Sequence, residues 1–491
     1  MWKLKRLRQT IKVWNKEVFG DVNRQVDYQL ERVQQIQADI ESEGFTEELR
    51  ERELEAQRKL SRTLLMQSNF LQQKARSAWL KDGDRNTAFF HHCCQIRNGR
   101  SGIQGLMVDG TYTEDPMALG NHIISFYTSF LRIKGVALWT IDQVISPIVR
   151  ASDNAGLTVI PSNSEIKEVV FDMGSDSSPG PDGFNGVFYR HFWDVISANV
   201  SDAVRFFFTS SSLPTRLNDS FMALILKTKD ANSIENFRPI VMSNFLFKII
   251  SKILATRSGK FIYAYLSPTQ FGFILGRQIH DCIAMVFEGF NVLHGRTDTN
   301  MILKIDIRKA FDTLKWGFLL HVLRHFGFSE IFIHWVDVIL RSSRISVLLN
   351  GTPVNPKLTH LLFGYDIVIL CATTIANARQ IFELLEVYAN ISGQVFNPAN
   401  YMVFFGSRVF SHIWNCIQGI MGISLGSLST SYLGVPIFNG APKQAVLQPL
   451  YEKILMKFKR WKGSSLSIAR RICLVNSVIT SFFVHSMAVF F

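Results

Sequence analysis

Apolar residues recur every three or four positions through the first part of the chain, which is otherwise polar and charged. Two such rows stand out, Leu30, Val33, Ile36 and Ile40, and then Leu60, Leu64, Leu65, Phe70 and Leu71. This spacing places the apolar residues on one face of a helix. The acidic block from Glu41 to Glu55 contains Gly44, where the chain can turn. We therefore expect antiparallel helices over residues 1–77.

Turn residues and short apolar segments alternate over residues 78–150, which we expect to form a connector with hairpin-like and helical segments. Asp109-Gly110 is typical of a hairpin tip, and helical spacing returns from Ile123 to Leu131. The stretch from Ala151 to Ser164 is predicted to be a linker.

Residues 165–300 combine loops with both kinds of regular element. Ser177–Phe184, with the sequence SSPGPDGF, is too rich in Pro and Gly for a helix or strand. Alternation predicts a strand from Phe221 to Leu226 that ends at Lys227, and Asn236–Ile240 is expected to form a second basic turn around Arg238. Helices are predicted near Phe247–Ser258 and after the loop Gln270–Asp281.

A buried strand is predicted at Met301-Ile302-Leu303, and it leads to Asp306 near its end. A charged side chain there needs a partner, and a metal ion would supply one. An Asp between a strand and a helix is more often a helix cap or part of a surface turn. This motif by itself leaves both interpretations open.

Composition favours a folded protein with a polyanionic partner. The 491 residues are 47% hydrophobic, enough for two to four domains, and the formal net charge is +13. A basic balance is compatible with nucleic-acid binding but does not establish it. The six cysteines form no CxxC pair, which favours an intracellular, reducing compartment, either nucleus or cytoplasm. The uncharged end from Ile472 to Phe491 carries several polar residues, so we expect a buried helix and no membrane partner.

A series of short motifs spans the chain from Trp14 to its end. They are WNKEVFG (14–20), WLKDGDRNTAFFH (79–91), SSPGPDGF (177–184), NFRPI (236–240), QFGFILGRQI (270–279), KIDIRKAFD (304–312), HLLFGYD (360–366), YLGVPI (432–437) and LSIARRICLVNSVI (466–479). In kind and order they resemble the reverse transcriptase of a LINE-type non-LTR retrotransposon, as found in plants. Each motif alone is weak evidence for this family, whereas the occurrence of all of them in the family's order is specific to it.

The resemblance implies an α+β, right-hand polymerase fold with fingers, a palm built on an antiparallel sheet, and a partial thumb, preceded by a long helical N-terminal region. The expected ranges are 151–300 for the fingers, 301–440 for the palm and 441–491 for a truncated thumb. The implied activity is RNA-directed DNA polymerisation, with Mg²⁺ as cofactor and an RNA template, a DNA primer and deoxynucleoside triphosphates as partners. It implies no oligomeric state.

The resemblance also assigns roles to individual residues. Asp306 and Asp366 would be catalytic carboxylates that hold metal ions. Lys227 and Arg238 would bind the incoming triphosphate, and Phe311 would pack against its sugar.

Three departures from the family pattern indicate impaired catalysis. Tyr365 stands where the family has a further Asp, and a neutral phenol is a poor Mg²⁺ ligand. Between 351 and 360 the chain lacks the family's RGLRQGDPLSP-like segment, and we expect this deletion to leave one face of the palm sheet uncovered. Asn400 stands where the family tends to have a lysine that protonates pyrophosphate, and an amide cannot act as that acid.

Four hypotheses follow from these observations. The chain is a reverse transcriptase with impaired chemistry, or it is a working polymerase that uses Asp306 and Asp366, with Asp312 as a substitute ligand. Alternatively it is a non-catalytic nucleic-acid-binding remnant, or a decayed reading frame with no molecular role. Primer extension and salt-dependent binding distinguish the first three.

Overall fold

The structure is a computed structural model. It describes residues 1–75, 102–130, 146–227, 231–295 apart from 273 and 275, 300–308, 313–358, 366–396 and 401–426, with short stretches beyond, up to 455. The chain divides into two compact units, one containing Met1–Gly102 and the other Ile103–Pro449. Each unit has its own buried core.

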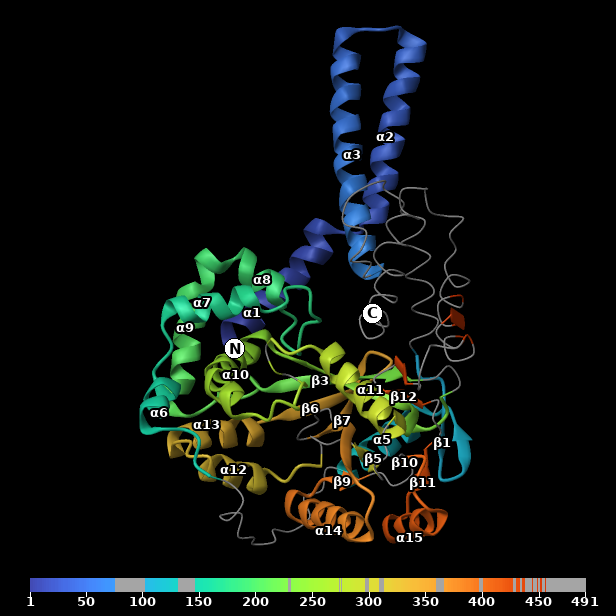
Figure 1. The fold of residues 1–491 in the computed structure, drawn as a ribbon. Coiled ribbons are helices and arrows are strands. Elements are labelled where there is room, and N and C mark those ends of the chain that lie inside the picture. The colour runs from blue at the N-terminus through green and yellow to red at the C-terminus, as the bar shows by residue number, and fades with distance from the viewer. Residues whose placement is uncertain are drawn as a thin grey trace. The chain divides into compact units, whose positions relative to one another are not determined.

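The N-terminal unit is helical, as the apolar spacing predicts (Figure 1). Its described helices are α1 (Trp2–Trp14), a π-helical turn (Asn15–Phe19), α2 (Val22–Glu43) and α3 (Glu47–Ala75). Helices α2 and α3 run antiparallel around a core of Val33, Ile36 and Ala56, with Ile40 and Leu60 packed against it. Gly44 ends α2 with a φ of +84°, a conformation that glycine adopts without strain. The turn therefore lies inside the predicted acidic block.

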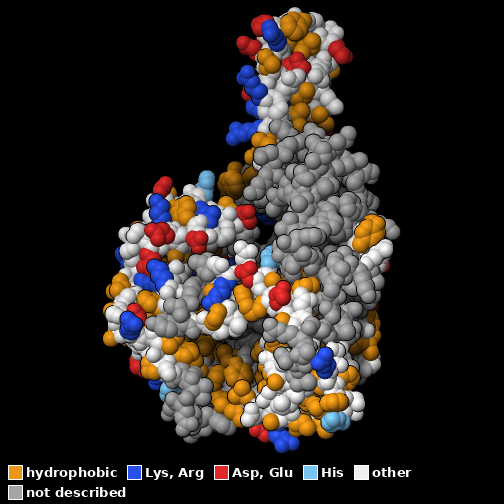
Figure 2. Space-filling model, viewed as in Figure 1, with side chains coloured by type: hydrophobic (Ala, Val, Ile, Leu, Met, Phe, Trp, Pro, Cys, Tyr) orange, Lys and Arg blue, Asp and Glu red, His pale blue; other side chains and the backbone are white. Residues whose placement is uncertain are grey.

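The exposed surface of this helical hairpin carries charges of both signs. Figure 2 shows acidic and basic side chains interspersed near the turn between α2 and α3. Leu30, Leu65 and Phe70 belong to the predicted apolar rows, yet each is more than 40% exposed. Only part of each row is thus used for packing between α2 and α3.

The second unit begins with a hairpin and a helix that cover a four-stranded sheet. Strands β1 (Leu106–Val108) and β2 (Thr111–Thr113) meet at Asp109-Gly110, where both residues have positive φ, and α5 spans Pro116–Phe130. This confirms the predicted hairpin tip and the helix after it. Apolar side chains from these elements join those of the sheet in one core, which includes Leu106, Ile123, Tyr127, Met222, Phe237 and Val347.

That sheet joins segments from distant parts of the chain. Its order is β4 (Phe237–Ser243), β3 (Asp219–Leu226), β6 (Arg344–Leu349) and β7 (Thr352–Leu358), with a 3₁₀ turn (Ile234–Asn236) before β4. Strand β3 is antiparallel to β4 and parallel to β6. The predicted strand at 221–226 is confirmed. The predicted turn around Arg238 is wrong, because Arg238 lies within β4 and its backbone pairs with Ile225.

Helices flank this part of the unit: α6 (Ala151–Thr158), α7 (Asn163–Asp172), α8 (Gly186–His191), α9 (Trp193–Ser210), α10 (Phe245–Tyr265), α12 (Trp316–His325) and α13 (Glu330–Arg341). The predicted linker at 151–164 is wrong, since α6 and the start of α7 occupy it. Leu157 is fully buried, and Ser162 caps α7 by accepting a hydrogen bond from the backbone of Glu165. The segment is polar in sequence because one side of each short helix faces solvent.

The SSPGPDGF segment is irregular, as predicted, and it is fixed by one buried amide. Asn244, 1% exposed, accepts a hydrogen bond from the backbone of Asp182 at 2.9 Å. Its amide nitrogen donates to the carbonyls of Arg216 and Leu217 at 3.1 and 2.9 Å. Asn244 therefore ties the loop to the segment that precedes β3.

The central sheet is built around β5 (Asn300–Arg308). Strand β5 pairs antiparallel with β8 (Asp366–Ala372) on one side, and with β10 (Met402–Phe405) and β9 (Val395–Phe396) on the other, while β11 (Ser424–Leu425) extends the sheet beyond β10. Met301, Ile302 and Leu303 are at most 1% exposed, which confirms the predicted buried strand.

Both faces of the central sheet are covered. Met301, Leu303 and Ile305 pack with α14 (Ile375–Ser392) and α15 (Ser411–Met421). Ile302 on the other face packs with α11 (Ile279–Gly295) and with the hairpin of β12 (Thr430–Tyr432) and β13 (Val435–Ile437). The expectation of an uncovered face is therefore wrong, because elements later in the chain and α11 supply the cover.

The fold class is α+β, as predicted. Within the described part of the chain, no helix is both long and apolar enough to cross a bilayer. The predicted helix at 472–491 and the predicted thumb range at 441–491 lie largely or wholly outside the described residues.

Candidate active site

Asp306 and Asp366 occupy directly opposite positions on two neighbouring strands. They form the last pair in the antiparallel ladder of β5 and β8. Residues directly opposite in such a ladder lie on the same face of the sheet. The fold therefore brings to one sheet end two acidic residues that are separated by 59 intervening residues in the sequence.

Side chains along β5 alternate between the two faces of the sheet, and this alternation sets the surroundings of Asp306. Asp306 is partly buried, and Ile305 beside it points into the apolar core under α14 and α15. Tyr401, directly before β10, is only 5% exposed. Burial, and to a smaller extent the negative charge of Asp306, raises the pKa of the Tyr401 phenol to about 12. Tyr401 is thus neutral at physiological pH.

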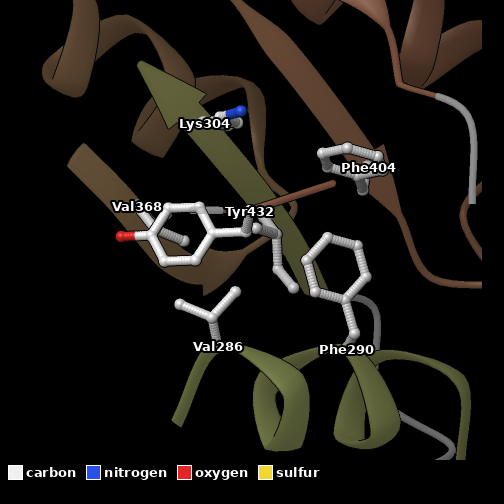
Figure 3. Close-up of a pocket in the computed structure, with 7 residues that line it drawn as sticks. Val286, Phe290, Lys304, Val368, Phe404 and Tyr432 are labelled. Carbon is white, nitrogen blue, oxygen red and sulfur yellow. The ribbon is translucent and has the colours of Figure 1, made fainter. Parts of the chain in front are cut away.

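Lys304 lies on the same face of β5 as Asp306, one strand period away. It lines a small pocket whose other walls are apolar or aromatic: Val286, Phe290, Ile302, Val368, Phe404 and Tyr432. Figure 3 shows Val286 and Phe290 projecting from α11 toward the strands, with the Tyr432 ring beside Val368. The Lys304 ammonium lies 5.9 Å from the Tyr432 ring centroid, within cation–π range.

Sequence reasoning missed Lys304. The available signal was the two-residue period of β5, which puts residues 302, 304 and 306 on one face. The motif drew attention to the aspartate alone, although a lysine two positions earlier shares its face.

Lys227 and Arg238 come together at one end of the four-stranded sheet. Arg238 is opposite Ile225 in the β3–β4 ladder, and Lys227 directly follows β3. Both side chains are exposed, and the Lys227 ammonium donates to the carbonyl of Glu235 at 2.7 Å. The β3–β4 pair therefore presents two cations on one edge, while the two aspartates belong to a different sheet.

The remaining predicted site residues, Phe311, Tyr365 and Asn400, lie outside the described residues, as does Asp312. Of Asp366 the structure describes the backbone. No group of three or more His, Cys, Asp or Glu residues suited to a metal ion occurs in the described part of the chain. The donor set at the sheet end is two carboxylate residues, which suits one Mg²⁺ ion, since Mg²⁺ usually takes one or two protein carboxylates and completes its shell with water and phosphate.

A family model described as reverse transcriptase (RNA-dependent DNA polymerase) matches residues 225–365. The match contains Lys227, Arg238 and Asp306 and stops one residue before Asp366. The chain carries a reverse transcriptase domain of the non-LTR retrotransposon type.

Two relatives support this conclusion. The Transposon TX1 uncharacterized 149 kDa protein of Xenopus laevis is 24% identical over 474 residues, covering 84% of this chain and 36% of that protein. The Retrovirus-related Pol polyprotein from type-2 retrotransposable element R2DM of Drosophila melanogaster is 29% identical over 161 residues, covering 33% of this chain and 15% of that protein. The reverse transcriptase chain thus spans about a third or less of the length of these relatives.

Proposed function

We propose that this reverse transcriptase chain retains part of the substrate-binding elements of an RNA-directed DNA polymerase and has lost most of its catalytic power. The pairing of Asp306 with Asp366 in one ladder carries the proposal. Two acidic residues at one sheet end place negative charge where a divalent cation can bind. Such an arrangement is unfavourable for folding without a cation, because like charges opposite each other repel.

In this proposal the central sheet is the palm, and the exposed cations of the β3–β4 pair belong to the fingers. Asp306 and Asp366 would hold Mg²⁺, and the ion would supply electrostatic stabilisation for the charge that develops on the primer 3′-oxygen and on the pyrophosphate. Lys227 and Arg238 bind and orient the triphosphate. Phe311 packs against its sugar. The partners are an RNA template and a DNA primer.

Loss of chemistry follows from the residue at position 365. A phenol would offer Mg²⁺ a neutral oxygen, whereas two-metal catalysis needs charged oxygen ligands. With two carboxylates the site would suit one ion and would lack a charged ligand for a second. In the same scheme, the absence of the segment between 351 and 360 removes template positioning. The amide of Asn400 cannot replace the lysine that would donate a proton to pyrophosphate.

Primer extension tests the proposal directly. The purified chain is incubated with an RNA template, an annealed DNA primer, deoxynucleoside triphosphates and either Mg²⁺ or Mn²⁺, beside an Asp306→Ala control. We expect extension at or near the level of the control. Extension that is robust and disappears in Asp306→Ala would show that two carboxylates suffice and would overturn the proposed impairment.

A second candidate function is nucleic-acid binding without synthesis. It is favoured by the formal net charge of +13 and by the exposure of Lys227 and Arg238. Binding of a labelled template–primer duplex should weaken steeply as salt rises, and the double substitution Lys227→Gln with Arg238→Gln should reduce the slope. No measurable binding at low salt by a folded sample would exclude this function.

A further inference from the structure

Two histidines one helical turn apart form a close pair on α12. His321 and His325 are both partly buried, and their Nε2 atoms lie 3.0 Å apart. Their ring centroids are separated by 4.3 Å, with an interplanar angle of 69°. A spacing of four residues places side chains above one another on the same helix face. The pair is distinct from the candidate active site, which uses carboxylates on β5 and β8.

The nitrogen–nitrogen distance suits a shared ligand. As a hydrogen bond it requires one Nε2 to donate and the other to accept. As a chelate, two nitrogens each about 2.1 Å from an ion and 3.0 Å apart subtend an angle of about 90°. That is the angle between neighbouring ligands in tetragonal and octahedral geometry. At the same metal–nitrogen distance, a tetrahedral ion would need a separation of about 3.4 Å.

We propose that His321 and His325 chelate a divalent transition-metal ion of the Cu²⁺ or Ni²⁺ class, with water in the remaining positions. Imidazole nitrogens in tetragonal geometry select these ions, whereas Mg²⁺ prefers oxygen ligands. Since no third protein ligand joins the pair in the described part of the chain, the site is bidentate and exchangeable.

The charges next to the pair are compatible with a bound cation. Arg324, between the two histidines in sequence, makes a bidentate ion pair with Glu330 at 2.6 and 2.8 Å. This pairing directs the Arg324 guanidinium toward a carboxylate and compensates its charge. An ion bound to the pair would stabilise the last turn of α12. This is the first described helix after β5, the strand that contains Asp306.

Nickel titration of the untagged, full-length chain by calorimetry at neutral pH tests the proposal. The variants are His321→Gln and His325→Gln, and the matched control is His334→Gln, an exposed histidine on the neighbouring helix α13. The parent and the two pair variants share all other metal-binding side chains, so a difference in nickel binding between them reports the His321–His325 pair. The His334→Gln control shows the effect of removing a histidine elsewhere. Each variant should lose one site or bind there about 10²-fold more weakly, because the second imidazole binds intramolecularly. His334→Gln should behave as the parent.

Unchanged binding in either pair variant overturns the proposal, since a chelate needs both rings. Circular dichroism of each variant confirms that it is folded. If a pair variant fails to fold, paramagnetic resonance of the parent with half an equivalent of Cu²⁺ replaces the comparison. Two nitrogen donors would support the site, and one or none would overturn it.

Discussion

A tyrosine at position 365 stands directly before the aspartate that pairs with Asp306. In the proposed metal site, a carboxylate in place of this phenol would add a charged oxygen ligand. Two carboxylates would suit one Mg²⁺ ion, and a third would help to hold a second. Substitution of residue 365 can therefore separate metal binding from catalysis by experiment.

Restoring the acid should increase metal binding without restoring synthesis. We expect Tyr365→Asp to bind Mg²⁺ more tightly by calorimetry, by roughly tenfold, because it adds a charged oxygen ligand. Primer extension should remain at the level of Asp306→Ala, because the segment missing between 351 and 360 is still absent. Tyr365→Phe is the matched control and should change neither quantity. Robust extension by Tyr365→Asp would contradict the view that the deletion is disabling.

The residues of the candidate site were predictable from sequence to the extent that a motif marks them. Asp306 follows a buried apolar run, so its strand was predicted, whereas the strand that begins at Asp366 was not. The direct opposition of the two residues could not be inferred, because the register depends on packing of residues 60 positions apart in the chain. The pair His321 and His325 was visible in the sequence only as a spacing of four residues. Its significance emerged only from the rotamers that bring the two nitrogens together.

At the scale of elements, a single buried polar side chain, Asn244, positions the irregular SSPGPDGF loop. The SSPGPDGF loop lies against the start of α10, and a Cβ atom added at Gly180 would overlap the backbone of Ser243 and Asn244. Glycine is required at this position for close approach of two backbones, and its φ is not in the left-handed region. The composition of the loop predicted irregularity, whereas its anchor, Asn244, lies 60 residues later and had no sequence signal.

Substitution at this contact should destabilise the second unit. Gly180→Ala is expected to cost about 1–3 kcal/mol of unfolding free energy, because the overlap must be relieved by moving the loop away from Asn244. Chemical denaturation of the full chain measures this cost. Gly174→Ala is the control, since a Cβ there meets no atom within 4 Å. Equal stability of the two variants would show that the loop shifts freely and that Asn244 does not fix it.

The predicted linker at 151–164 illustrates a limit of pattern reasoning. Short helices such as α6 contain few core residues, so their apolar periodicity is weak. Their burial depends on partners elsewhere: Arg257 on α10 donates to the carbonyls of Leu157 and Val159 and pairs with Glu165. Those interactions hold the segment in helical form but leave no trace in the local sequence.

At the scale of the whole molecule, the chain consists of two units with separate cores. The helical hairpin has a small core, and its long exposed faces depend on charged residues for solubility. The second unit contains the four-stranded sheet, the central five-stranded sheet and every predicted site residue that the structure describes. Length and composition predicted several cores, while the pairing of β3 with β6 across more than 100 residues could only be seen in the fold.

Separate cores predict that damage to one unit stays within it. Ile36 is 6% exposed in the α2–α3 core, and Ile36→Ala should lower the free energy of opening of these helices by about 2 kcal/mol or more. Hydrogen exchange measured by mass spectrometry should show lost protection in α2 and α3 and unchanged protection in β3, β5 and β6. Leu30→Ala is the control, because Leu30 is 45% exposed and its removal leaves no cavity. If Ile36→Ala also deprotected the strands of the central sheet, the hairpin would have to form one cooperative folding unit with the second unit.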